Sequence, residues 1–190
     1  MDKIEVTLDA IGYPMPVSVV GATVEGKPNF LTVAWFSMVN FKPPYIMVAM
    51  GKSHYSNAGI KETGAFSVNI PSVSMAETVD YCGLVSGRKI DKSSLFEVFY
   101  GKVGNAPMIK ECPYNIECKL VKTVDLPSDE LFIGEIVAIY SESQFLSDGV
   151  PDMTKIKPFI LNMPQTTFLD VGDDIGRAWS MGKGLIKKEM

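Results

Sequence analysis

The residues between Lys52 and Asn57 are the clearest candidates for binding chemistry in this sequence. The segment leads from an apolar stretch into a predicted helix, and it contains a lysine, a histidine, two serines and an asparagine. Unpaired backbone N–H groups and the positive end of a helix dipole favour a bound phosphate there. Ser53 and Ser56 can donate hydrogen bonds, and Lys52 adds positive charge. Taken alone, the segment fits an ordinary helix N-cap as well as a phosphate site.

A second candidate lies between Asn29 and Trp35. Polar Asn29 and Thr32 stand among the bulky side chains of Phe30, Leu31 and Trp35. This pattern suits a flat heteroaromatic ligand, with backbone N–H groups at its edge and apolar contact on its face. An amphipathic strand with Trp35 in the core would give the same pattern.

Several kinds of catalytic site are excluded. The one histidine, His54, and the absence of Cys-x-x-Cys argue against the usual zinc sites, so no metal ligand is predicted. The sequence contains no Gly-x-Ser-x-Gly, Walker A or Gly-x-Gly-x-x-Gly motif. We therefore predict no catalytic side chain, and we interpret Cys82, Cys112 and Cys118 as inert thiols.

The first half of the chain predicts the elements that hold both candidate segments. Val17–Val24 and Phe30–Trp35 are predicted to form a hairpin with a loop of about five residues, because residues 25–29 are rich in turn formers. After Pro43 and Pro44, Tyr45–Met50 has the pattern of a strand covered on both faces. A helix is expected over Ser56–Thr63, with a capping hydroxyl from Ser53 or Ser56 and a left-handed stop at Gly64.

The rest of the chain is also strand-rich. A capping box of Ser74 and Glu77 predicts a helix from Ser72 to Tyr81, and residues 83–92 are expected to form a loop. The other predicted strands are Ala65–Ile70, Tyr114–Val121, Leu131–Tyr140 and Phe159–Leu161. Many short strands with two or three short helices predict a mainly β fold, a β-barrel of Greek-key type.

The chain is predicted to form one domain over residues 1–171 and a C-terminal arm over 172–190. The arm contains four glycines and scattered cations, so we expect it to be loosely packed or to form an interface. The 190 residues carry a net charge of −4, and the pI near 5.1 argues against nucleic acid as a partner. An odd number of cysteines, no signal-peptide pattern and no apolar run near 20 residues predict a cytoplasmic protein without membrane contact.

The order of motifs from Tyr13 to Ser72 resembles the flavoredoxin and flavin reductase-like family. Three strings carry the resemblance: Asn-Phe-Leu-Thr-x-Ala-Trp, a Pro-Pro pair before a strand, and Ser-His-Tyr-Ser-Asn before a helix. It continues through residues 82–92, residues 131–142 and the closing DDIGRAW, and so covers nearly the whole chain. Members of this family are FMN-binding split β-barrels that work as homodimers, which is what the resemblance implies here.

The resemblance also implies roles for individual residues. Backbone amides of residues 29–32 would hold the isoalloxazine edge, Lys92 would reach the flavin or its phosphate, and Phe159 or Phe168 would pack beside the flavin. The complete set of residues implied to bind the cofactor is Asn29, Phe30, Leu31, Thr32, Trp35, Met50, Lys52, Ser53, His54, Ser56, Asn57, Lys92 and Phe168.

One departure from the family and one charge pattern stand out. The family often has a histidine just before the Phe-x-Gly-Glu strand, where this chain has Asp129, Glu130 and Leu131. A carboxylate facing the cofactor would lower its reduction potential. The acidic chain groups its cations in two loops, at Lys52 and at residues 88–92, where they could neutralise a phosphate.

The function implied by the resemblance is an FMN-dependent oxidoreductase. Flavin N5 would accept electrons from NAD(P)H or from a redox protein and pass them to another flavin or acceptor, while the protein binds and orients. The alternative is a non-catalytic FMN-binding electron carrier or a small-ligand-binding barrel. An oligonucleotide-binding barrel is disfavoured by the acidic pI.

Overall fold

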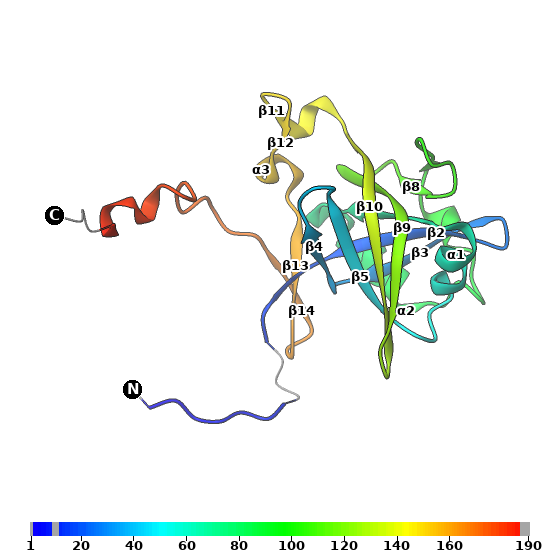
Figure 1. Cartoon of the computed structure of the whole chain (residues 1–190), viewed down its shortest axis with the longest axis horizontal. Helices are drawn as coiled ribbons and strands as arrows, with labels where there is room; N and C mark the ends of the chain where they lie inside the picture. Colours follow the sequence, from blue (N-terminus) through cyan, green and yellow to red (C-terminus); the bar gives the residue numbers. More distant parts are fainter. Residues whose placement is uncertain (1, 9–11, 187–190) are drawn as a thin grey trace.

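The computed structural model describes residues 2–8 and 12–186, and its centre is one antiparallel sheet that curves into a barrel (Figure 1). The mainly β prediction is confirmed. The strands follow one another across the sheet as β3 (Lys27–Val33), β2 (Ser18–Val24), β6 (Ala65–Ile70), β9 (Tyr114–Asp125), β10 (Asp129–Ser141), β5 (Tyr45–Gly51) and β4 (Phe36–Asn40).

The barrel closes around an apolar interior. β3 approaches β5 from the far end of the sheet, so alternate residues of both strands point into one core. On β5, for example, Ile46, Val48 and Met50 are buried and belong to this core, together with Phe66 and Phe132. The residues between them on β5 are only partly buried. The prediction that both faces of this strand are covered is therefore confirmed for the inner face and only in part for the outer one.

Helices and short strands cover the ends of the barrel and its outer surface. The helices are α1 (Ser56–Thr63), α2 (Ala76–Leu84) and α3 (Met153–Ile156), and short 3-10 turns are η1 (Val73–Met75), η2 (Lys92–Leu95), η3 (Ser143–Phe145) and η4 (Met181–Leu185). A separate small sheet joins β1 (Pro14–Pro16), β13 (Phe159–Asn162) and β14 (Thr167–Asp170). Two short ladders pair β7 (Val98–Phe99) with β8 (Met108–Ile109) and β11 (Leu146–Ser147) with β12 (Val150–Pro151).

The first hairpin is tighter than predicted. β2 and β3 are joined by Glu25 and Gly26 alone, both with positive φ (51° and 75°). Such a pair of left-handed residues matches the twist of two antiparallel strands, so the connection needs only two residues. Pro28 lies on β3 opposite Thr23, and the missing N–H of proline is tolerated because β3 is an edge strand.

The helix after β5 has the predicted bounds but not the predicted cap. α1 spans Ser56–Thr63 and ends at Gly64 in the left-handed conformation (φ 66°), as expected. Its N-cap residue is Tyr55, so the predicted capping hydroxyl from Ser53 or Ser56 was wrong; Ser56 bonds elsewhere. The predicted capping box was wrong too, because Ser74 lies inside η1 and α2 begins after Met75.

Close packing fixes α1 against the first hairpin. A Cβ atom on Gly59 would collide with the carbonyl oxygen of Thr23 and lie 2.7 Å from Val24 Cγ2. The helix backbone therefore lies directly on β2, and it carries the end of the candidate phosphate segment, Ser56 and Asn57, with it.

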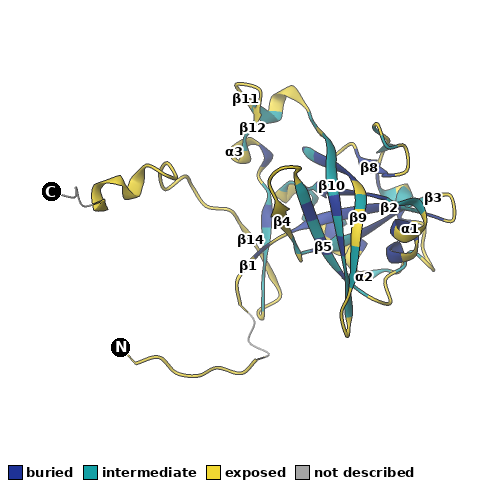
Figure 2. Cartoon of the chain, viewed as in Figure 1, coloured by how far each residue is buried: buried dark blue, intermediate teal, exposed yellow. Residues whose placement is uncertain are grey.

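The chain after β14 leaves the barrel. Residues 172–186 are exposed throughout and extend away from the sheets, on the side of the molecule where β13 and β14 lie (Figure 2). The predicted C-terminal arm over 172–190 stays a prediction, and its residues 187–190 lie outside the described residues. Among the described helices, none has the length and hydrophobicity needed to span a membrane.

Candidate functional site

Two adjoining cavities lie where β3, the start of α1 and residues 83–92 meet. We name them the Ser56 cavity, about 210 Å³, and the Arg88 cavity, about 240 Å³. Asn29, Tyr55, Gly87 and Lys92 line both, so these residues form the wall between them. The Ser56 cavity is completed by Leu31, Ser53, His54, Ser56, Gly83, Leu84, Val85 and Ser86. The Arg88 cavity is completed by Val24, Glu25, Lys27, Pro28, Arg88, Lys89, Ile90 and Asp91.

Lys92 supplies a buried positive charge to these cavities. Only 2% of the residue is exposed, and its Nζ donates hydrogen bonds to the carbonyl oxygens of Cys82 (2.9 Å) and Val85 (3.1 Å) at the end of α2. No carboxylate in the described part of the chain forms an ion pair with it. Burial lowers the pKa of this ammonium, because the charged form loses its hydration. A buried ammonium without a carboxylate is costly, and an anion bound in the cavity would offset that cost.

Asn29 and Ser56 join β3 to α1 across the floor of the Ser56 cavity. Asn29 Nδ2 donates a 2.7 Å hydrogen bond to Ser56 Oγ, and both residues are buried. The hydroxyl hydrogen of Ser56 can therefore be directed to a bound oxygen.

The segment from residue 83 to 92 closes over this floor. A Cβ atom on Gly87 would collide with the Asn29 side chain and lie 2.9 Å from the Tyr55 ring, so a side chain at this position would separate the two walls. A Cβ atom on Gly83 would lie 3.3 Å from Thr32 Cβ, a tighter contact than usual but not a collision. Glycines at these two positions let residues 83–87 lie directly against β3 and the start of α1.

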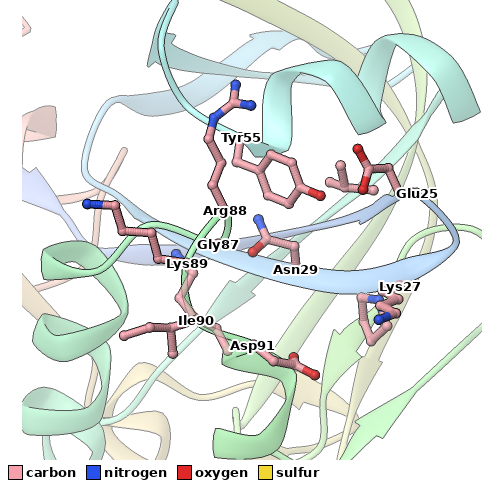
Figure 3. A pocket seen from close by; sticks show the side chains of 12 residues that line it. Glu25, Lys27, Asn29, Tyr55, Gly87, Arg88, Lys89, Ile90 and Asp91 are labelled. Atoms are coloured by element: carbon pink, nitrogen blue, oxygen red, sulfur yellow. The ribbon is translucent and has the colours of Figure 1, made fainter.

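Positive charge dominates the lining of the Arg88 cavity. Figure 3 shows the Arg88 guanidinium beside the Tyr55 ring, and its Cζ lies 5.2 Å from the ring centroid, a cation–π contact. The tyrosine hydroxyl points toward Glu25 in the same view. Across both cavities four cations, Lys27, Arg88, Lys89 and Lys92, face two carboxylates, Glu25 and Asp91. In a chain of net charge −4, this local excess of cations favours an anionic ligand.

A second network fixes the turn that carries Ser53 and His54. Asn57 Nδ2 donates to the Gly51 carbonyl oxygen (3.1 Å) and to Glu130 Oε2 (2.9 Å). Lys61 Nζ in turn donates to Glu130 Oε1 (2.8 Å), and this hydrogen bond is the main reason why the pKa of the Glu130 carboxyl is lowered. Glu130 therefore acts on the start of α1.

His54 lines the Ser56 cavity as a neutral side chain. Burial and the nearby Lys92 ammonium lower its pKa from the ordinary value of 6.5, although Asp129 acts in the opposite direction. At neutral pH the imidazole can donate and accept hydrogen bonds but adds no charge.

The structure brings together only part of the predicted residue set. Asn29, Leu31, Ser53, His54, Ser56 and Lys92 line the cavities. Asn57 is buried beside them in the Glu130 network. Lys52 lies outside the lining found for both cavities and pairs instead with Asp125, 2.7 Å away.

The apolar members of the predicted set are more scattered. Met50 is buried inside the barrel, and Phe30 is buried edge-to-face against Phe96 with centroids 5.4 Å apart. Trp35 is 45% exposed just after β3, and Phe168 packs on Phe159 in the small sheet. The Thr32 hydroxyl donates to the Val79 carbonyl oxygen, so it ties α2 to β3.

Sequence reasoning missed several residues that line the cavities. Tyr55, Gly83 and Gly87 were not predicted as site residues, and neither were Glu25 and Lys27. Gly83 lies in the last turn of α2 and Gly87 in the loop that follows; two glycines this close after a predicted helix were the signal available for them. Glu25 and Lys27 reach the cavity because the turn between β2 and β3 has only two residues, whereas the sequence predicted a loop of about five.

The curved sheet and the cation-rich cavities beside it define a β-barrel protein whose candidate site carries an excess of positive charge. The family model described as flavin reductase like domain matches residues 10–151, so the chain belongs to the flavin reductase-like family, as the motifs predicted. The chain is 49% identical to flavoredoxin from Methanosarcina acetivorans, with a TM-score of 0.96 over 98% of this chain and 100% of that one.

Two further solved structures agree on the fold. Flavoredoxin of Desulfovibrio vulgaris (Miyazaki F) is 33% identical, with a TM-score of 0.87 over 96% of this chain and 100% of that chain. A split-barrel protein from Shewanella frigidimarina is 20% identical, with a TM-score of 0.79 over 90% of this chain and 88% of that one. The split-barrel prediction is therefore confirmed.

Proposed function

We propose that the protein is a flavoprotein oxidoreductase that binds FMN, with the phosphate in the Ser56 cavity. The observation that carries this proposal is Lys92, a buried ammonium that faces a cavity and pairs with two carbonyl oxygens rather than a carboxylate. The likeness to two flavoredoxins supports flavin as the ligand, and FMN is the form that carries a phosphate monoester.

The residues present fit such a ligand. Ser53, Ser56 and neutral His54 offer hydrogen-bond donors at the start of α1, and Lys92 offers charge. Leu31 and the exposed Leu84 extend the same cavity along an apolar wall, which suits the ring system. The residue set therefore provides hydrogen-bond donors, a positive charge and apolar side chains around one cavity.

When bound, FMN would supply the ring that accepts and donates electrons. The protein's own residues bind and orient it: the Asn29–Ser56 hydrogen bond aligns the hydroxyl, and the Glu130–Asn57 network holds the turn that carries Ser53. Lys92 would neutralise the phosphate, and Lys61 neutralises the Glu130 carboxylate near the start of α1. NAD(P)H or a reduced redox protein is proposed as the electron donor.

The test uses three ligands that differ at the tail of the flavin. Protein freed of any cofactor is titrated with FMN, riboflavin and FAD, and binding is followed by the quenching of flavin fluorescence. We expect FMN to bind more tightly than riboflavin, because only FMN carries the phosphate that Lys92 would neutralise. Equal affinity for FMN and riboflavin, or no uptake of either, would refute the site assignment.

The electron donor is tested on the FMN-loaded protein. Loss of absorbance at ~450 nm, set by the flavin itself, is measured after mixing with NADH, NADPH or a reduced ferredoxin. Rapid bleaching by a nicotinamide would support a reductase. Bleaching by ferredoxin alone would support an electron carrier, and a flavin that none of these reduces would favour the non-catalytic ligand-binding alternative.

A further inference from the structure

A separate open cavity lies where β9 begins and β10 ends, and it shares no lining residue with the Ser56 and Arg88 cavities. We name it the Tyr140 cavity. Its volume is about 390 Å³, which is within the range of small-molecule sites. Its lining includes two aromatic rings, one amide and three charged side chains, namely Phe99, Tyr140, Asn115, Glu97, Lys110 and Glu142.

The aromatic wall of the Tyr140 cavity is held in place by contacts behind it. The rings of Phe99 and Tyr140 meet edge to face, with centroids 5.8 Å apart. The Tyr140 hydroxyl donates a 3.1 Å hydrogen bond to Oε2 of Glu117, which is fully buried. The same carboxylate accepts the backbone N–H groups of Lys102 (2.9 Å) and Val103 (2.8 Å). The wall is therefore fixed before any ligand binds.

Negative charge surrounds this wall. The cavity lining carries two carboxylates, Glu97 and Glu142, and one ammonium group, that of Lys110. A third carboxylate, that of Glu111, lies beside them and accepts the Glu97 N–H (2.9 Å). Behind the wall, Glu117 forms no ion pair within the described part of the chain. A buried carboxylate without a cation is costly, and a cation bound in front of the wall would offset part of that cost.

Lys110 shows how this charge acts on an ammonium group. Its Nζ donates to Glu97 Oε1 at 2.5 Å, and this hydrogen bond is the main reason why its pKa is raised above the ordinary value of 10.5. The carboxylates of Glu111 and Glu142 act in the same direction. Both side chains of the Lys110–Glu97 pair are more than half exposed, so the pair lies at the rim of the cavity. The surroundings of the cavity therefore favour a positively charged group.

Asn115 offers an acceptor inside the cavity. Only 3% of this residue is exposed, and its Nδ2 donates to Asn69 Oδ1 (2.8 Å) and to the carbonyl oxygen of Ile109 (2.8 Å). Both amide hydrogens are thus used within the protein, while no donor among the described residues bonds to Asn115 Oδ1. This oxygen is not fully enclosed, and the residue lines the cavity, so the oxygen is available to a ligand that donates hydrogen bonds.

We propose that the Tyr140 cavity binds a small organic ammonium ion, with its charged group at the acceptors and its apolar body against the rings. A protonated primary amine donates up to three hydrogen bonds and accepts none, which matches Asn115 Oδ1 and the carboxylates of Glu97 and Glu142. Aromatic rings also stabilise a cation near their faces, and more strongly when water is excluded. The cavity would take such an amine whether or not flavin binds at the candidate site, because the two places share no lining residue.

Titration with two ligands of similar shape tests the preference for charge. Phenethylammonium and phenethyl alcohol have the same ring and chain and differ only in the terminal group. Each is added to isotope-labelled full-length protein, and NMR shifts of the backbone amides give the dissociation constant and the residues affected. We expect the ammonium ion to bind roughly tenfold more tightly than the alcohol. The largest shifts should occur at Asn115 and Tyr140.

Two double variants separate the cavity from the overall charge of the chain. Glu97→Gln with Glu142→Gln changes the charge of the lining from net negative to net positive. It should weaken binding of the ammonium ion about tenfold and leave binding of the alcohol unchanged. Glu62→Gln with Glu77→Gln removes the same charge from α1 and α2 and should leave both affinities unchanged. All four glutamates are exposed, so both variants should fold, which circular dichroism checks.

Four results would overturn the proposal. They are equal affinity for the two ligands, no binding of either, shifts confined to residues outside the Tyr140 cavity, and binding of the ammonium ion that Glu97→Gln with Glu142→Gln does not weaken.

Discussion

Replacing Lys92 with methionine separates ligand binding from folding at the proposed site. Methionine keeps most of the length and apolar volume of the side chain but removes the ammonium. In the folded protein this group is 2% exposed and donates to the carbonyl oxygens of Cys82 and Val85. It therefore has two roles that the substitution removes together: it caps the end of α2 and it places charge in the cavity.

The substitution should affect the free energy of unfolding and the affinity for FMN to different extents. Losing two charge-assisted hydrogen bonds costs about 1.5–3 kcal/mol each. The substitution also removes the desolvation penalty of a buried ammonium that has no carboxylate partner, which is several kcal/mol and roughly cancels that loss. We expect the free energy of unfolding of the cofactor-free protein to change little. In the complex, however, the phosphate would lose its buried partner, at a cost of roughly 2–4 kcal/mol. This corresponds to about 30- to 1000-fold weaker FMN binding.

Flavin fluorescence titration gives the dissociation constant for FMN, and denaturant unfolding of the same samples gives the free energy of unfolding. Lys89→Met is the matched control, because Lys89 is exposed in the same loop and should weaken FMN binding far less. The affinity of the wild-type protein for FMN should also fall at alkaline pH. Because burial lowers the pKa of Lys92, this fall should begin at a pH below the ordinary lysine pKa of 10.5. It should be absent in Lys92→Met. A variant that unfolds easily yet binds FMN normally would show that Lys92 only caps α2.

Three further predictions follow from the contacts around the site. Ser56→Ala should weaken FMN binding by about 1–2 kcal/mol, whereas Lys52→Ala should leave the titration almost unchanged because Lys52 pairs with Asp125 at the surface. Glu130→Gln should make the free energy of unfolding less dependent on pH under acidic conditions. Because folding lowers the pKa of Glu130, the ionised carboxylate stabilises the folded protein above pH ~4.3, the unfolded value. This stabilisation is lost as the pH falls. The wild-type profile, measured by thermal melts from pH 3 to 7, should therefore fall more steeply than that of the variant. The three cysteines are buried, and burial raises the pKa of each thiol, so Ellman's reagent should react with them only after denaturant is added; rapid reaction in the native protein would contradict this.

Local patterns predicted the strands and α1 well, because their signals lie within a few residues. The bounds of α1 and its stop at Gly64 follow from a helix-forming stretch ended by glycine. β4 was missed because Phe36–Asn40 mixes polar and apolar residues before two prolines, and its pairing with β5 is what holds it in the sheet. β14 was missed for a similar reason, since its four residues pair only with β13.

The candidate site was less predictable, because it depends on contacts between distant segments. Lys52 adjoins Ser53 in sequence, yet the hairpin of β9 and β10 brings Asp125 to it and draws the ammonium away. Burial of Lys92, in contrast, arises from the carbonyl groups at the end of α2, which no local pattern around residue 92 reveals. The family resemblance supplied Lys92, and the structure gives the physical reason for its importance.

The contact of Gly59 with Thr23 has a consequence for exchange kinetics. Since α1 rests on β2 without intervening side chains, the wall with Asn29 and Ser56 moves as a unit with the barrel. The opposite wall, residues 83–92, lies against β3 and Tyr55 through the close approach of Gly83 and Gly87, and Lys92 ties the end of this segment back to Cys82 and Val85. A bound molecule would then enter and leave by displacement of residues 83–92 alone. The rate at which this segment opens would set the residence time of the molecule.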